Sequence, residues 1–426
     1  MGQMGTRHAW IGAALLAACV AAPGAWAEGE VTYSNQIARV MQKHCNVCHR
    51  DQGIAPMSFS DYATVRKFAP MIKEVVQQRR MPPWHADPNV GHFSNARNLS
   101  DEEISMIGAW VDNRAPRGND ADLPAPLHFD GAWSIGTPDV IFEMPEEVSV
   151  EADGTVPYLY FETPTNFTED KWVRAVQAVP GNDKVVHHII VFMKDERGGA
   201  RGSREGRDGS LGIGKGFLKG FAPGVEPMIL PEDMAVKIPA GTTLVWQMHY
   251  TATGKPETDR SRIGMVFADG PPKFEHKTAT AATHDFAIPA GADNYKVETE
   301  YVFADDATLL DMTPHMHVRG KSYSYTAIFP DGREELLLSV PRYDFNWQNT
   351  YRLAKPLFMP KGSKLHCVAH FDNSTANPAN PDPSTTVYWG DQTWEEMMIG
   401  WFSLVWGDRG EGAGHAQSFT TTALSK

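Results

Sequence analysis

The sequence predicts a multidomain protein in which a small all-α domain is followed by two all-β antiparallel sandwiches, jelly-roll-like in type. The chain has 426 residues, which is too long for a single hydrophobic core. Helical signals lie before residue 120, whereas short strand-like runs between glycine and proline turns dominate afterwards. We expect a helical domain at residues 28–120, a polar Gly/Pro linker at 121–127, and sandwiches at 128–280 and 281–426.

The first 27 residues have the features of an export signal. Arg7 precedes an apolar run from Ile11 to Val20, and Ala25-Trp26-Ala27 supplies an Ala-x-Ala cleavage site. We exclude residues 1–27 from the fold. The apolar run is too short to span a bilayer, and no later apolar stretch reaches about 20 residues. We expect a mature bacterial protein that is periplasmic or secreted and has no membrane span.

Charge and cysteine content exclude several classes of partner and bond. The formal net charge is −13 and no basic block is present, so nucleic acid and anionic membrane surfaces are not expected partners. Of the four cysteines, Cys19 lies in the signal, Cys45 and Cys48 share one motif, and Cys367 stands apart. Structural disulfides are therefore not expected.

A helical pattern at residues 35–43 ends at Cys45-Asn46-Val47-Cys48-His49. Cys-x-x-Cys-His is the attachment signal for one covalent haem c, with thioether bonds to both cysteines and His49 as the proximal iron ligand. The rival interpretations are a redox Cys-x-x-Cys motif and half of a zinc site. The sequence has no second cysteine pair for zinc and no βαβ pattern around the motif, so haem attachment is favoured.

The sixth iron ligand is expected downstream. Met81 precedes Pro82-Pro83, and these prolines exclude helix and would hold the thioether still. A Met/His pair would suit electron transfer rather than oxygen binding. The competing candidates, each of which has an alternative role in packing or at the surface, are Met57, His85 and His92.

A capping box follows this stretch. Ser100 and Glu103 have the spacing of a helix N-cap, and Trp110-Val111 continue the apolar pattern. Together with the Met81 turn, this helix resembles the last helix of small class I c-type cytochromes.

His315 and His317 form a His-x-His pair at the centre of the second sandwich. If Pro314 marks the start of a strand, residues two apart point to one face, so both imidazoles could bind a single metal ion. Met397 lies in a later run, residues 396–402, that is apolar on both faces. A methionine there is usually core packing, but two imidazoles and a thioether together would select Cu(I).

His187 and His188 are adjacent in the first sandwich, so a regular strand would point them to opposite faces. Unless a bulge or a strand end directs both inward, one is a core histidine and the other is exposed. His249, in the strand pattern at 244–251, favours the first possibility, because three imidazoles would form a copper site of three nitrogens.

The span 197–224 contains many glycines but lacks the spacing of a phosphate-binding loop. We expect a long mobile loop that borders the substrate.

Taken together, the motifs at His187-His188, His249, His315-Met316-His317 and Met397 are similar in order and spacing to the copper type II, ascorbate-dependent monooxygenases. This family includes dopamine β-hydroxylase and peptidylglycine α-hydroxylating monooxygenase, and the resemblance covers about residues 130–410. It implies two sandwiches facing each other across a solvated cleft and two copper ions. The first three histidines would hold the electron-supplying copper, and His315, His317 and Met397 the copper that activates O2.

The resemblance implies insertion of one atom of O2 into a substrate C–H bond. Three departures matter. The animal enzymes have many disulfides, whereas Cys367 has no evident partner here. The animal enzymes also lack an attached cytochrome, which this sequence predicts. The positions that hold a peptide carboxylate in the peptidylglycine enzymes are Thr313, Ile399 and Trp401 here, which favours a small, more apolar or aromatic substrate. We expect an external donor to reduce the haem, which would replace ascorbate as the immediate electron source.

Two other functions fit the same motifs. One is a periplasmic haem-copper protein that carries electrons or binds copper without oxygenase activity. The other is a binding module in which only Cys45, Cys48 and His49 retain a role. The complete set of six copper ligands favours the monooxygenase hypothesis over both.

Overall fold

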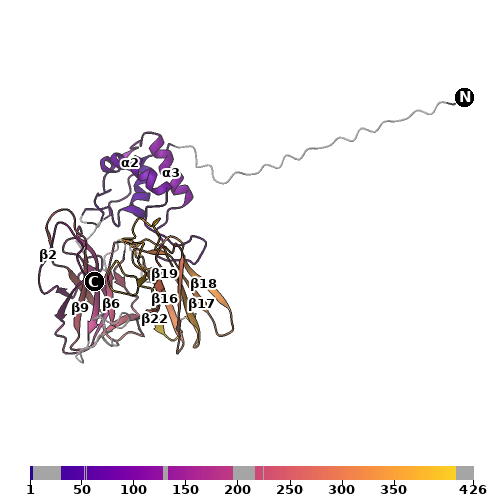
Figure 1. Ribbon diagram of the computed structural model, residues 1–426. Coiled ribbons are helices and arrows are strands. Elements are labelled where there is room, and N and C mark those ends of the chain that lie inside the picture. Colours follow the sequence, from indigo (N-terminus) through magenta and orange to yellow (C-terminus); the bar gives the residue numbers. More distant parts are fainter. Residues whose placement is uncertain are drawn as a thin grey trace.

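The computed structural model describes residues 1–2, 30–51, 53, 55–127, 133–194, 216–223 and 225–408. Nearly all of the export signal predicted at residues 1–27 lies outside the described residues. The described helical segments precede the strands along the chain (Figure 1). They are η1 (Tyr33–Ile37), α1 (Ala38–Val40), η2 (Met41–Cys45), α2 (Tyr62–Gln77), α3 (Asp101–Asp112) and η3 (Asp120–Asp122). The prediction of a mainly β chain with a few N-terminal helices is confirmed.

Side-chain caps begin the two longest helices. Ser100 Oγ accepts a hydrogen bond from Glu103 N at 3.1 Å, and the Glu103 carboxylate accepts one from Ser100 N at 2.9 Å, so the predicted capping box is confirmed. Asp61 caps α2 through Thr64 N at 3.0 Å. The helices of this helical unit enclose a core of their own, which includes Ile37, Val65, Ile107 and Trp110.

The first β unit has two main sheets that share a core. Its strands are β1 (Val140–Glu143), β2 (Val148–Val150), β3 (Leu159–Pro164), β4 (Lys171–Val179), β5 (Val186–Lys194), β6 (Phe217–Phe221), β7 (Met228–Ile229), β8 (Met234–Ile238), β9 (Thr243–Tyr250), β10 (Glu257–Asp259), β11 (Arg262–Phe267) and β12 (Phe274–Glu275). One sheet has the order β1-β11-β4-β8-β12, with β7 beside β4, and the other has the order β3-β9-β5-β6. Val176 and Met265 from the first sheet are buried in the same cluster as Ile189 and Trp246 from the second.

The second β unit has the same plan. Its strands are β13 (Lys277–Ala282), β14 (Ala287–Ile288), β15 (Tyr295–Val302), β16 (Ala307–His315), β17 (Gly320–Ile328), β18 (Glu334–Val340), β19 (Tyr351–Met359), β20 (Lys364–Phe371), β21 (Val387–Tyr388) and β22 (Ile399–Trp406). The sheets β13-β22-β16-β19 and β15-β20-β17-β18 share one core. They approach closely at Gly400, where an added Cβ would lie 2.8 Å from Cys367 Sγ. Pairing of β13 with β22 begins this unit at Lys277, shortly before the expected boundary at residue 281.

The chain between α2 and α3 runs along the second β unit. Asp87 N donates to Ser339 O at 2.8 Å, and a bridge joins Phe93 to Leu353. The rings of Trp84 and Phe93 lie 4.8 and 5.6 Å from that of Tyr351, between ring centroids. This aromatic contact fixes the helical unit against the β units, beside which it lies in Figure 1.

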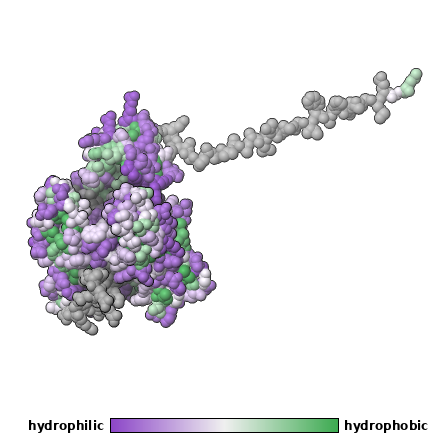
Figure 2. All heavy atoms as spheres, in the orientation of Figure 1, coloured by the Kyte–Doolittle hydropathy of each residue, from purple (hydrophilic) through white to green (hydrophobic). Residues whose placement is uncertain are grey.

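None of the described helices is long and apolar enough to cross a membrane, and no span was predicted. On the face drawn in Figure 2, hydrophilic residues predominate on the helical unit, and apolar residues form small separate clusters over the β units. The three described cysteines, Cys45, Cys48 and Cys367, are free thiols.

Candidate functional site

Three histidines of the first β unit converge in the interior. His187 and His188 lie on β5, and His249 lies on β9. The pairing of the two strands shifts between Val186 and His188, which is the bulge that the adjacent histidines require. One ligand nitrogen from each of the three rings lies within 4.8 Å of the other two. The structure therefore brings together all three residues of the predicted three-nitrogen site.

The same histidines have ring nitrogens without hydrogen-bond partners. These buried atoms are Nδ1 of His187, Nδ1 and Nε2 of His188, and Nδ1 of His249. An unpaired buried nitrogen is costly, and a metal ion would satisfy all three rings at once. Burial and the neighbouring His187 lower the pKa of His249 to about 3, and burial holds the pKa of His188 well below its usual value. Neutral imidazoles with free lone pairs fit a copper or zinc ion.

The second set of predicted ligands lies at the ends of two strands. His315 is the last residue of β16, His317 follows it, and Met397 precedes β22. The two imidazole centroids are 5.3 Å apart, and the rings are nearly perpendicular at 89°. The condition that Pro314 starts a strand is not met: β16 ends one residue after Pro314, at His315, where a missing N–H is tolerated. The paired histidines and the methionine nevertheless line one small cavity.

Hydrogen bonds orient both rings of this pair. His315 Nδ1 donates to Gln348 Oε1 at 2.6 Å, and His317 Nδ1 donates to the Glu395 carbonyl at 3.2 Å. The buried Nε2 of His317 has no hydrogen-bond partner. Ligand histidines in metalloproteins are held in this way through the other ring nitrogen. Two oriented imidazoles and the buried Met397 thioether fit a soft copper ion.

Glu396 was not assigned a role from the sequence, although it adjoins Met397. It is fully buried, and its carboxylate accepts hydrogen bonds from the backbone N–H groups of His317 at 2.8 Å and Arg319 at 2.6 Å. Burial raises the pKa of Glu396 to about 8, against the opposing effect of these bonds and of the Arg319 charge. Glu396 therefore ties the His315–His317 turn to the segment that carries Met397. A glutamate next to an apolar run was the only signal in the sequence.

The two ligand sets adjoin each other. His188 lines the small cavity together with His315, His317 and Met397. The ring of Phe345 stacks on His187, with centroids 5.0 Å apart and planes at 18°, and meets His317 edge-on at 6.0 Å. One aromatic ring of the second unit thus contacts a histidine of each set.

Tyr158 forms another wall of this cavity and was not singled out from the sequence. Its ring lies 5.1 Å from that of His188 and 4.8 Å from that of His249. Burial raises the pKa of its hydroxyl, so the group stays protonated. No local pattern marks Tyr158, because it reaches the histidines through the pairing of β3, which it precedes, with β9.

A larger cavity opens between the two β units. It measures about 1100 Å³, including space open to solvent, and both His188 and His315 line it. Apolar side chains form much of its wall, and Thr313 and Trp401, two positions of interest in the family resemblance, also line it. The glycine-rich span 197–224 lies largely outside the described residues. Its end is not a loop, because Phe217–Phe221 forms β6 and lines the cavity.

The Cys-x-x-Cys-His segment closes the first helical run. His49 N donates to Cys45 O at 2.8 Å, and His49 Nδ1 donates to Met57 O at 3.1 Å. The His49 ring stacks on Phe59 with centroids 4.3 Å apart. Burial raises the pKa of Cys45 to about 12, so it is a protonated free thiol. Two free thiols and a ring oriented through Nδ1 fit covalent haem attachment with His49 Nε2 as the iron ligand.

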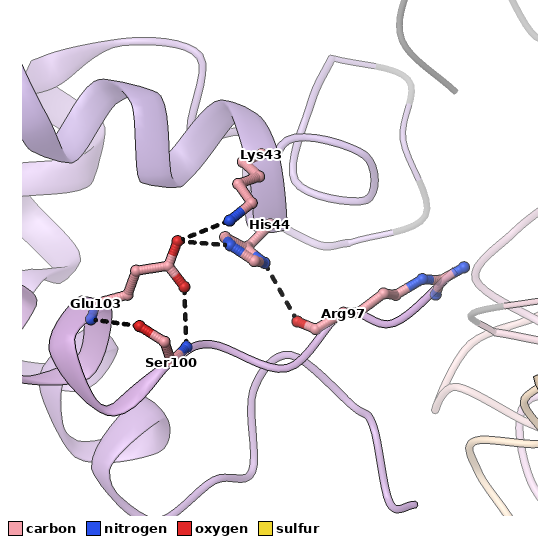
Figure 3. Close-up of polar contacts among 5 residues, drawn as sticks. All are labelled: Lys43, His44, Arg97, Ser100 and Glu103. Carbon is pink, nitrogen blue, oxygen red and sulfur yellow. Dashed lines mark hydrogen bonds and ion pairs between the residues drawn. The ribbon is translucent and has the colours of Figure 1, made fainter. Parts of the chain in front are cut away.

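Polar contacts hold this segment in place (Figure 3). His44, which precedes Cys45, contacts Glu103 Oε1 through Nε2 at 3.0 Å and the Arg97 carbonyl through Nδ1 at 3.3 Å. Lys43 Nζ donates to the same carboxylate oxygen at 3.0 Å. Glu103 therefore joins the attachment segment to the start of α3.

The four candidates for the sixth iron ligand occupy different surroundings. Met81 is half-buried after α2, and Met57 packs against the helical core. His85 lies at the contact with the second β unit, where burial lowers its pKa and Asp344 opposes the shift. His92 accepts a backbone hydrogen bond from Ala354 N at 2.7 Å. Met81 as the ligand stays a prediction.

No protein-family model matches the chain, and no curated protein matches it. The solved structures that align with it include viral capsid proteins. A structure of infectious bursal disease virus, Gx strain, covers 68% of this chain and 76% of its own at 8% identity and a TM-score of 0.19. The PBCV-1 VP54 structure fitted into the virophage Sputnik covers 66% of this chain and 97% of its own, also at 8% identity, with a TM-score of 0.22. Likeness at this level carries no argument about fold or function.

Proposed function

We propose that this chain is an exported haem-copper monooxygenase that hydroxylates a C–H bond of a small apolar or aromatic substrate. One observation carries the proposal. A three-histidine set, His187, His188 and His249, adjoins a set of two histidines and a methionine, His315, His317 and Met397, at one cavity. A set of three nitrogen ligands beside a set that includes a soft thioether suits two copper ions, one that supplies electrons and one that activates O2.

The proposal includes the finer architecture. Residues 28–120 would form a class I c-type cytochrome unit, and residues 128–280 and 281–426 two jelly-roll-like copper-binding sandwiches. The export signal at residues 1–27 would direct the chain to the periplasm or the medium, where haem attachment occurs. An external donor would reduce the haem.

The net reaction combines substrate C–H, O2, two electrons and two protons to give an alcohol and water. Copper, when bound at the two ligand sets, supplies one-electron redox chemistry with O2, and haem, when bound at Cys45, Cys48 and His49, supplies an electron store.

The chain's own residues position the reactants. Gln348 and the Glu395 carbonyl fix the two rings of the His315 pair through Nδ1. The protonated Tyr158 hydroxyl lies at the cavity wall and can hold a proton there. Trp401 and the other apolar side chains of the larger cavity offer the substrate an apolar surface.

The test is O2 consumption by reduced, copper-loaded protein across a panel of small aromatic and aliphatic compounds, with product mass measured. We expect one added oxygen atom per product. Met397→Ile should abolish oxygenation and leave the haem spectrum intact, because a soft ligand is lost. Met359→Ile, at a fully buried methionine in the core of the second β unit, is the control and should remain active. Copper binding without oxygen consumption in the unaltered protein would instead support an electron-transfer or copper-binding protein.

A further inference from the structure

A lysine that has no hydrogen-bonding partner among the described residues lines the large cavity. Lys219 lies on β6, in register with Val191 of β5, and is half-buried. Within the described part of the chain, its ammonium group forms no hydrogen bond or close ion pair. Burial lowers the pKa of Lys219 to about 8, so the group is still mostly charged at pH 7. A partly desolvated cation without an acceptor is costly unless a ligand supplies one.

Among the described residues, Lys219, Arg352, Glu226 and Asp311 are the charged lysine, arginine and carboxylate side chains that line the cavity. Glu226 pairs with two arginines, Arg97 at 2.9 Å and Arg352 at 3.6 Å. Asp311 lies beside Arg352 in the strand register. Arg352 is therefore shared by the two carboxylates, whereas the Lys219 ammonium group still lacks a hydrogen-bond acceptor within the described ranges, which a ligand carboxylate would supply.

A neutral hydrogen-bonding group completes this end of the cavity. His276 is 5% exposed, lines the cavity and has a buried Nδ1 without a partner. Burial lowers its pKa to about 4, so it adds no positive charge at pH 7. Nearby, the rings of Phe217 and Trp401 are 4.8 Å apart and provide an apolar wall. One cavity thus offers both a polar end and an aromatic surface.

We propose that the substrate is a small monoanion, a carboxylate on an aromatic or branched aliphatic body, whose carboxylate binds Lys219. The body lies against Phe217 and Trp401, which leaves its C–H bonds on the side of the cavity lined by His315. The inference rests on the proposed function for the reaction that follows binding, but the binding itself does not require it. It also differs from the carboxylate contacts of the peptidylglycine enzymes, which this sequence lacks at Thr313.

Titration calorimetry at pH 7 with phenylacetate and its neutral analogue phenylacetamide tests the inference. The full-length protein is used with copper, and again without copper to remove direct coordination by the carboxylate. We expect phenylacetate to bind the unaltered protein at least tenfold more tightly than phenylacetamide. Lys219→Met should weaken phenylacetate binding at least tenfold and leave phenylacetamide binding unchanged, because one charge-assisted hydrogen bond is lost.

Two further variants make the result specific. Lys219→Arg should keep phenylacetate binding within about threefold, since the charge is retained. Lys237→Met, at a lysine paired with Asp170 on the first β unit, is the control and should bind like the unaltered protein. If Lys219→Met does not fold, Lys219→Gln takes its place. Equal binding of the two compounds, absence of phenylacetate binding at millimolar concentration, or no effect of Lys219→Met (or of Lys219→Gln in its place) on phenylacetate binding overturns the inference.

Oxygenation assays separate this inference from the proposed function. Lys219-dependent phenylacetate binding without an oxygenated product supports the anion site and refutes the monooxygenase. Hydroxylation of phenylacetate that is insensitive to Lys219→Met supports the monooxygenase and refutes the anion site.

Discussion

Phe345 and His187 lie in near-parallel contact across the boundary between the β units, and the same Phe345 ring reaches His317. We expect Phe345→Leu to lower the turnover rate about tenfold while both copper ions still bind, because the ligand nitrogens remain but one histidine ring of each set loses its contact. Copper content and kcat measured on the same sample check this. Phe358→Leu, at a half-buried phenylalanine on β19, is the control and should leave kcat unchanged. Loss of copper in the Phe345 variant would mean that the ring supports metal binding instead.

We expect His276 to make the stability of the folded chain decrease in acid. Its pKa in the folded chain is about 4, below the ordinary histidine value that it regains on unfolding. The unfolded chain therefore binds the proton first as pH falls. The contribution of His276 to the free energy of unfolding is complete above the ordinary pKa of histidine and is lost as the pH decreases toward 4. This contribution amounts to about 3 kcal/mol. Urea unfolding at pH 7 and pH 4.5 should show a smaller decrease for His276→Leu than for the unaltered chain. Equal decreases would contradict this explanation.

Single functional residues could be predicted where they belong to a short sequence motif. The six predicted copper ligands stand in short motifs, and the adjacency of His187 and His188, taken together with His249, favoured the bulge that the structure contains. Tyr158 and Phe345 belong to no such motif, because their contacts arise only when distant strands and loops pack together.

At the scale of elements, the turn after β16 depends on one buried carboxylate. Glu396→Ala would leave the N–H groups of His317 and Arg319, and the Arg319 charge, without their acceptor. We expect a loss of about 3–5 kcal/mol in the free energy of unfolding. Bound copper should decrease from two equivalents to one, because His317 and Met397 lose their common support.

Chemical denaturation and metal analysis measure these two effects. Glu298→Ala, at an exposed carboxylate on β15, is the control. Unchanged stability and two retained copper ions in Glu396→Ala would show that the turn after β16 keeps its conformation without the Glu396 carboxylate.

Strand faces could be predicted, but strand ends could not. Residues two apart in a strand share a face, and Leu244, Trp246, Met248 and Tyr250 of the strand predicted at 244–251 are all buried in the same core. The end of β16 at His315 was not predicted, and the loop expected over 197–224 was wrong where β6 forms, because both features depend on pairing with distant strands.

For the molecule as a whole, the unpredicted feature is the contact between the helical unit and the second β unit. Trp84, Phe93 and Tyr351 form it. Composition and periodicity separate a helical region from two β regions, but they do not show which faces meet. The stretch around Met81 and His85 was interpreted only as a source of haem ligands, whereas Trp84, within it, packs against the second β core.

We expect the contact of Trp84 and Phe93 with Tyr351 to affect electron transfer from the helical unit to the β units. Trp84→Ala should slow reoxidation of the haem by O2 in copper-loaded protein at least fivefold, because the helical unit loses its aromatic contact with the β unit. The haem spectrum should not change. Stopped-flow absorbance follows the reaction, and Trp172→Ala, on the first β unit, is the control. An unaltered rate would indicate that electrons reach the coppers without this contact.

The central claim is that six side chains from distant parts of the chain form two copper sites. The most direct test is metal analysis after copper reconstitution and exhaustive dialysis of the unaltered chain, His249→Ala and His315→Ala. We predict two, one and one tightly bound copper ions per chain, respectively, with haem iron present in all three. Fewer than two in the unaltered chain, or loss of both ions in either variant, would contradict the claim.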